Sequence, residues 1–218
     1  MGKLILRATA VSCGLWVLLI VLVLMMPHED TQAQDFMSAV DNCGGRCIFN
    51  IQPGKTRVGE ALSQLHNQPW VRDVVENATG NGYATISWGW NGTQPAGIDA
   101  RRLGRITFFW EDENIIPMDE AIVETITIYT NVRHFSLQNW LGAGGGGSAT
   151  FRPDGKLAYS VAYDMPGGTL NLYVEMACPL DLMNYWNAHT RMTLSIGHSP
   201  NSYVHPGELA RMCRLSRS

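Results

Sequence analysis

The sequence is poor in charged residues. Only 16% of its 218 residues are Asp, Glu, Lys or Arg, whereas 45% are hydrophobic. A chain of this composition is too apolar to remain disordered, and it is long enough to bury a sizeable core. Setting aside Lys3 and Arg7 leaves 14 of the 16 basic residues against 19 acidic ones. The chain therefore lacks the basic excess that is typical of proteins that bind DNA or RNA, and we expect no nucleic-acid partner.

Recognisable catalytic motifs are also missing. No G-x-S-x-G marks a serine nucleophile, and the glycine run at 142–147 contains G-x-G-x-x-G without a G-K-[ST] after it. That run follows a helix-like segment and leaves no room for a helix behind it, so it predicts a loop and not a dinucleotide site. His189, His198 and His205 lie near one another in the sequence, but their spacing matches no common metal-ligand pattern. We therefore predict no catalytic, cofactor-binding or metal-binding residues.

Residues 8–26 form an uncharged, strongly hydrophobic run. Its length suits a helix across about 30 Å of hydrocarbon. Because Lys3 and Arg7 precede it, the positive-inside rule predicts a cytoplasmic N-terminus and an extracytoplasmic remainder. The alternative is a cleaved signal peptide with a small-residue site at 31–33. The expected domains are a membrane anchor or signal peptide (1–26), a polar tether (27–42) and an extracytoplasmic domain (43–218).

Four cysteines follow the hydrophobic run: Cys43, Cys47, Cys178 and Cys213. An even number in an exported domain predicts disulfides, and four cysteines allow three pairings. We expect bonds from Cys43 and Cys47 to the C-terminal half. The alternatives are a redox pair or a metal site, although C-x-x-x-C is not the C-x-x-C of thiol oxidoreductases, and no second close pair completes a zinc site.

Hydrophobic periodicity divides the rest of the chain into two similar halves, at about 43–131 and 132–218. Each half opens with a short amphipathic segment, which follows Thr56 in the first half and Ser136 in the second, and these segments predict helices. Runs in which apolar residues alternate with polar or small ones follow in both halves and predict strands: 83–90, 105–111, 121–130, 156–164, 169–177 and 191–197. The expected fold class is α+β, with an N-terminal transmembrane helix and two degenerate helix-plus-antiparallel-strand repeats that form one sheet-based domain.

The segment CGGRCIFNIQPGKTRVGEA at 43–61 resembles one in uncharacterised membrane-anchored exported proteins of filamentous green bacteria. The shared pattern is C-x3-C-x5-PG-x-T-x3-EA, which Cys43, Cys47, Pro53, Gly54, Thr56, Glu60 and Ala61 match, and Ile51 matches as well. That resemblance implies no known activity. A looser likeness is to the helix-plus-sheet repeats of outer-membrane assembly lipoproteins and of β-lactamase inhibitor protein, and it implies a protein-binding scaffold without catalysis.

The sequence contains seven tryptophans, and three of them, Trp88, Trp90 and Trp110, lie on alternating strands. Such residues are usually core, but on a solvent-facing side they would form a binding surface for a protein or a carbohydrate. The leading hypothesis is therefore a membrane-anchored extracytoplasmic domain that binds a protein or envelope component and catalyses nothing. The alternatives are an envelope enzyme, such as a metal-dependent hydrolase that uses the C-terminal histidines, and an accessory subunit of a membrane complex.

Overall fold

The computed structural model describes residues 14, 16, 31–41, 43–79, 82–110, 117–142, 144, 146–178, 185, 188–197 and 206–215. By its internal contacts the chain divides into Met1–Asp30 and Thr31–Ser218, and all helices and strands with defined bounds belong to the second unit. Within the described part of the chain, no helix is long and apolar enough to cross a membrane. The predicted transmembrane segment at 8–26 lies outside the described residues, except for Gly14 and Trp16.

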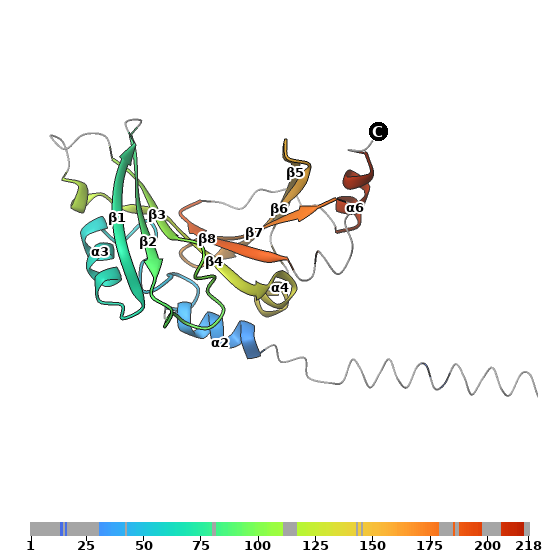
Figure 1. Ribbon diagram of the computed structural model, residues 1–218, viewed down its shortest axis with the longest axis horizontal. Coiled ribbons are helices and arrows are strands. Elements are labelled where there is room, and N and C mark those ends of the chain that lie inside the picture. The colour runs from blue at the N-terminus through green and yellow to red at the C-terminus, as the bar shows by residue number, and fades with distance from the viewer. Residues whose placement is uncertain are drawn as a thin grey trace, which may run out of the picture. The chain divides into compact units, whose positions relative to one another are not determined.

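The second unit is built around one eight-stranded antiparallel sheet with the strand order β1-β2-β3-β4-β8-β7-β6-β5 (Figure 1). The strands are β1 (Val71–Thr79), β2 (Tyr83–Trp90), β3 (Gly104–Phe109), β4 (Val123–Arg133), β5 (Gly146–Phe151), β6 (Lys156–Met165), β7 (Gly168–Ala177) and β8 (His189–Ser195). The helices are short: α2 (Thr31–Val40), α3 (Val58–His66), η1 (Met118–Glu120), α4 (His134–Leu141) and α6 (Pro206–Leu215).

The predicted α+β class with two helix-plus-strand repeats is therefore wrong, because the described chain is mostly one antiparallel sheet with a few short helices. The prediction missed two of the eight strands, β1 and β5, because neither has a clear period in the sequence. β1 contains an irregularity between Arg72 and Val75, which interrupts the alternation of side chains. β5 begins at Gly146, inside the glycine run that predicted a loop, and glycine has no side chain to reveal a strand period.

Helix α2 occupies residues that the sequence predicted to be a polar tether. Its buried residues recur at the helical spacing i, i+3, i+4 and i+7, and they belong to the main core: Ala33, Phe36, Met37 and Val40. The predicted tether at 27–42 therefore overlaps the folded unit from Thr31 onward.

One face of the sheet forms the core. A single row of buried apolar side chains crosses neighbouring strands in register: Ile86, Ile106, Ile126, Leu194 and Leu170. The buried apolar residues of α2, α3 and α4 belong to the same cluster as this row. The short helices therefore cover one side of the sheet, which we call the core face.

Trp88 packs on the core face against the bare backbone of β3. Its register partner is Gly104, and a Cβ atom at that glycine would lie 2.2 Å from the Trp88 indole. Trp88 also contacts Trp90, with ring centroids 5.8 Å apart, and Trp90 lies 5.5 Å from Trp70. Glycine at position 104 is thus required by the close approach of a fully buried indole.

Replacing Gly104 by Ala should destabilise the fold by about 1–3 kcal/mol, because the buried indole must shift to admit a methyl group. Gly89 on the adjacent strand is the matched control. A Cβ there would meet its nearest neighbour at 3.4 Å, an ordinary contact. Urea unfolding of G104A and G89A measures both, and equal stabilities would contradict the packing argument.

His134 opens helix α4 with a fully buried ring. Desolvation by burial lowers the pKa of His134 from 6.5 to about 4. Its Nδ1 lies 3.5 Å from Thr190 Oγ1, and its ring centroid lies 5.5 Å from that of Tyr185. Among the described residues, Nε2 has no hydrogen-bond partner. The fold therefore accepts the neutral imidazole and disfavours the charged one.

This burial makes stability depend on pH. Because the pKa is lower in the folded state, the unfolded chain binds more protons between about pH 6.5 and pH 4. The contribution of the neutral His134 ring to the free energy of unfolding is complete above pH 6.5 and is lost as the pH falls toward 4. Between pH 7 and pH 5, the wild type should lose about 2 kcal/mol more of its unfolding free energy than H134F does. Urea unfolding at both pH values tests this.

The control variant for this experiment is H66Q, which alters an exposed histidine on α3. It should keep the full pH-dependent loss of the wild type. Identical losses in the wild type and H134F would show that His134 does not contribute.

Candidate functional site

The side of the sheet opposite the core face carries small polar side chains. We call it the open face and define it by two rows that cross β2, β3, β4, β8 and β7 in register: Thr85, Thr107, Thr125, Ser195 and Thr169, and Ser87, Arg105, Thr127, Thr193 and Asn171. All of them except Thr169 keep part of their surface in solvent. Hydroxyl groups join neighbouring strands, with a hydrogen bond between Thr107 and Thr125 and a 3.1 Å contact between Thr127 and Thr193.

A hollow of about 500 Å³ lies at one end of the open face, over β4, β8 and β7. Tyr129, Arg191 and Tyr173 stand side by side in its wall, because they are register partners on these three strands. The Arg191 guanidinium lies 3.9 Å from the centroid of the Tyr173 ring. The Arg102 guanidinium lies 5.0 Å from the centroid of the Tyr129 ring. Each tyrosine thus holds a guanidinium against its face, a geometry that favours cation–π attraction.

Positive charge prevails in the hollow. Its lining includes the basic residues Arg102, Lys156 and Arg191 and the acidic residues Asp99 and Glu175. The Glu175 carboxylate is already engaged, because it accepts hydrogen bonds from Arg152 and from the Tyr173 hydroxyl, the latter at 3.2 Å. Arg191 Nε is buried and has no acceptor among the described residues. The guanidinium groups of Arg102 and Arg191 in the lining suit an oxygen acceptor with negative charge.

A second group of exposed side chains lies at another part of the same face. Tyr83 and Phe109 are register partners that keep 52% and 43% of their surface in solvent, and their rings meet edge to face at 5.4 Å. Val75, which pairs with Ser87, is 50% exposed. Exposed aromatic and aliphatic side chains on a rigid sheet are typical of surfaces that contact another macromolecule.

The tryptophans that the sequence suggested for a binding surface lie elsewhere. Trp88 is fully buried and Trp90 is 4% exposed, while Trp110 is partly buried against the core. The aromatic residues of the open face are instead Tyr83, Phe109, Tyr129 and Tyr173. The sequence did contain a signal for them, because each alternates along its strand with the buried apolar residues and so points to the other face of the sheet.

The four cysteines that follow the hydrophobic run form two disulfides, Cys43–Cys47 and Cys178–Cys213, with Cα separations of 5.9 Å and 5.4 Å. The prediction of disulfides is confirmed, but the expected bonds from Cys43 and Cys47 to the C-terminal half are wrong. Gly44 and Gly45 have positive φ angles of 70° and 81°, which turn the chain back within four residues. Cys178 follows the end of β7 and is bonded to Cys213 of α6. Each bond therefore joins two cysteines of the same part of the chain, and none links Cys43 or Cys47 to the C-terminal half.

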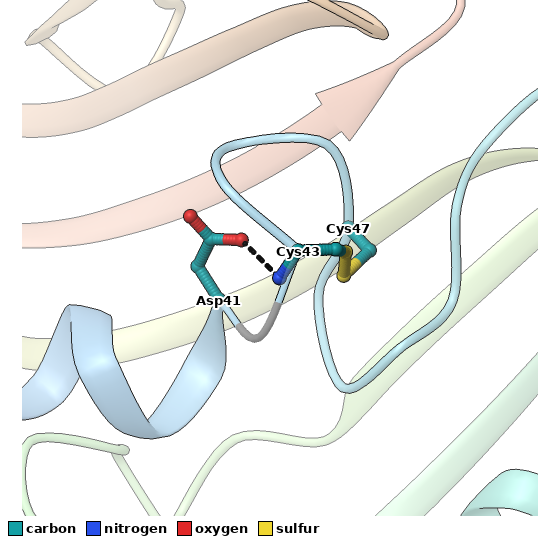
Figure 2. A group of neighbouring side chains, drawn as sticks. All are labelled: Asp41, Cys43 and Cys47. Atoms are coloured by element: carbon teal, nitrogen blue, oxygen red, sulfur yellow. Dashed lines mark hydrogen bonds between the residues drawn. A yellow bond between two sulfur atoms is a disulfide. The ribbon is translucent and has the colours of Figure 1, made fainter.

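Asp41 organises the loop of the first disulfide (Figure 2). The Cys43 N–H donates a hydrogen bond to its Oδ1 at 3.1 Å, and the Gly45 N–H donates to its Oδ2. A carboxylate oxygen and the two sulfur atoms lie within 4.8 Å of one another, a grouping that would suit a metal ion. Metal binding by cysteine requires thiolates, however, and the sulfurs joined in a disulfide offer none.

The histidines of the alternative enzyme hypothesis are placed only in part. His189 is the first residue of β8 and lines the hollow. His198 and His205 lie outside the described residues. The alternative of a metal-dependent hydrolase that uses the C-terminal histidines therefore stays untested.

Comparisons with protein-family models, with curated proteins and with solved structures find no match for the chain.

The two disulfides should differ in how strongly they stabilise the fold. Their sequence separations are 4 and 35 residues, so the second closes a much longer loop. On the chain-entropy account, replacing both Cys178 and Cys213 by Ser should cost about 4 kcal/mol, and replacing both Cys43 and Cys47 about 2 kcal/mol. Urea unfolding of the two double variants measures this. A larger loss in the Cys43/Cys47 variant would contradict the account.

Proposed function

We propose that this chain is an exported domain that holds an acidic segment of a partner protein on the open face of its sheet and carries out no catalysis there. The observation that carries the proposal is the row formed by Tyr129, Arg191 and Tyr173, with Arg102 beside it. Tyrosine and arginine are enriched at the centres of protein interfaces, where their large side chains combine apolar contact with hydrogen bonding.

The charge of the hollow supports an acidic partner. Arg152 already engages Glu175, and Lys156 Nζ lies 3.8 Å from Asp154 Oδ2, so Asp99 is the one acidic residue of the hollow's described lining that is left to oppose Arg102 and Arg191. Aspartate or glutamate side chains of a partner would supply acceptors for the guanidinium groups of Arg102 and Arg191. Charge-assisted hydrogen bonds of this kind fix the orientation of a partner and make binding sensitive to salt.

The extent of the face supports a macromolecular partner. A stable interface typically buries about 800 Å² on each partner, far more than one hollow provides. The exposed pair Tyr83–Phe109 at β2 and β3 extends the apolar contact area beyond the hollow along the same face. The aromatic and arginine side chains stand on strands, and a rigid scaffold reduces the entropy lost on binding.

Export is supported by the two disulfides, since such bonds form and persist in oxidising compartments. The hydrophobic run near the N-terminus agrees with this location.

Binding of defined peptides to the full-length protein tests the proposal. A fluorescently labelled peptide rich in Asp and Glu should bind, and fluorescence anisotropy should show weaker binding as salt rises. Neutral and Lys-rich peptides of equal length should bind at least tenfold more weakly. R191Q should weaken acidic-peptide binding about tenfold, because one charge-assisted hydrogen-bond donor is lost.

The matched control is R211Q, which removes an exposed arginine of α6 outside the hollow and should leave binding unchanged. Equal binding of the acidic and neutral peptides, or full binding by R191Q, would refute the proposal. Tighter binding of an anionic polysaccharide than of the acidic peptide would show that the partner is an envelope polymer and would refute the proposed protein partner.

A further inference from the structure

The two cysteines of the Cys43–Cys47 disulfide differ in their exposure to solvent. Cys43 is exposed, whereas Cys47 is 2% exposed. In the second disulfide, Cys213 is also 2% exposed and Cys178 is half-buried. Exchange of a disulfide begins when a thiolate reaches one of its sulfurs, so access decides whether and where the bond is attacked. Cys43 is the cysteine of these two bonds that an external thiolate reaches most readily.

The loop around Cys43 is held by hydrogen bonds that do not involve sulfur. The Phe49 N–H donates to the Val40 carbonyl at 2.9 Å, and the Asp41 N–H donates to the Met37 carbonyl at 2.8 Å. The Asp41 carboxylate accepts the N–H groups of Cys43 and Gly45. Both flanks of the loop therefore stay attached to α2 when the disulfide opens.

The position of this loop limits what reduction changes. Cys47 is followed by Ile48, whose bridge to Ile51 and contact with the core hold the chain directly after the disulfide. Gly44 and Gly45 allow the segment between the cysteines to relax as the sulfurs separate. Opening the bond thus alters one short loop and leaves the sheet in place. The Cys178–Cys213 bond, in contrast, joins helix α6 to the end of β7.

We infer that Cys43–Cys47 is a thiol–disulfide exchange site that oxidises a dithiol of another protein. One thiolate of the external dithiol attacks Cys43 Sγ and forms a mixed disulfide. The Cys43–Cys47 bond breaks, and Cys47 leaves with the electron pair as a thiolate that takes up a proton. The second external thiolate attacks the external sulfur of the mixed disulfide and releases the Cys43 thiolate, which is also protonated.

The external dithiol ends as a disulfide after losing two electrons, and the protein's disulfide ends as two thiols. An external disulfide that reacts in the reverse order restores the starting state. This activity is independent of any partner on the open face, because it uses neither the hollow nor the strands that form it.

The first experiment compares the two bonds within one molecule. The full-length protein is mixed with limiting dithiothreitol as the dithiol probe. Samples are quenched with N-ethylmaleimide, and the modified cysteines are identified by peptide mass spectrometry. Cys43 and Cys47 should become labelled at least tenfold faster than Cys178 and Cys213, while the far-UV circular dichroism spectrum stays unchanged. Equal rates, or faster opening of Cys178–Cys213, would overturn the inference.

The second experiment identifies the attacked sulfur. The matched single variants C47S and C43S each keep one thiol of the pair and the intact Cys178–Cys213 bond. With oxidised glutathione, Cys43 of C47S should form a mixed disulfide at least tenfold faster than Cys47 of C43S. Equal modification of the two variants, with native circular dichroism spectra, would refute the assigned order of attack. The wild-type comparison decides the inference by itself if a single variant fails to fold.

Discussion

The pairing of β4 with β8 is the constraint on which the rest of the structure depends. The strand order runs from β1 to β4 and then from β8 back to β5, so this one antiparallel pair joins two four-stranded meanders. It connects Thr125 with Ser195 and Tyr129 with Arg191, across more than sixty positions of sequence. Side chains alternate between faces, and a slip of one residue would exchange the faces of everything beyond the pair.

Correct register at this pair aligns the apolar row of the core face and the polar row of the open face. Ile126 meets Leu194 on the core face, and Thr127 meets Thr193 on the open face. The first contact continues the apolar row that the short helices cover, and the second continues the polar row that stays in solvent. The candidate binding hollow depends on the same register, because the β4–β8 pairing places Tyr129 beside Arg191, which already lies beside Tyr173 through the pairing of β8 with β7. The proposed binding function thus depends on side chains from both halves of the chain.

The two disulfides illustrate different uses of the same bond. Cys178–Cys213 attaches the last helix to the end of a central strand, where a long closed loop gives a cross-link its largest effect. Cys43–Cys47 closes a turn that Asp41 already holds by hydrogen bonds. Its entropic contribution is smaller, and the exposure of Cys43 leaves it open to chemistry. The exposed disulfide that closes a short loop is therefore suited to exchange reactions. The disulfide that closes a long loop is suited to stabilising the fold.

Local pattern in the sequence determined most of the strands and the presence of disulfides. The alternating run at 83–90 coincides with β2, and the runs near β3, β4, β6, β7 and β8 also lie on those strands, because side-chain period is a local property. Only tertiary structure decided the rest. The α+β prediction failed because a bulge in β1 and the glycines of β5 hide two strands from periodicity. The burial of Trp88 depends on a glycine across the strand, and the cysteine pairing depends on which chain segments meet. Contacts between distant residues follow from the pairing of whole strands, which short stretches of sequence do not encode.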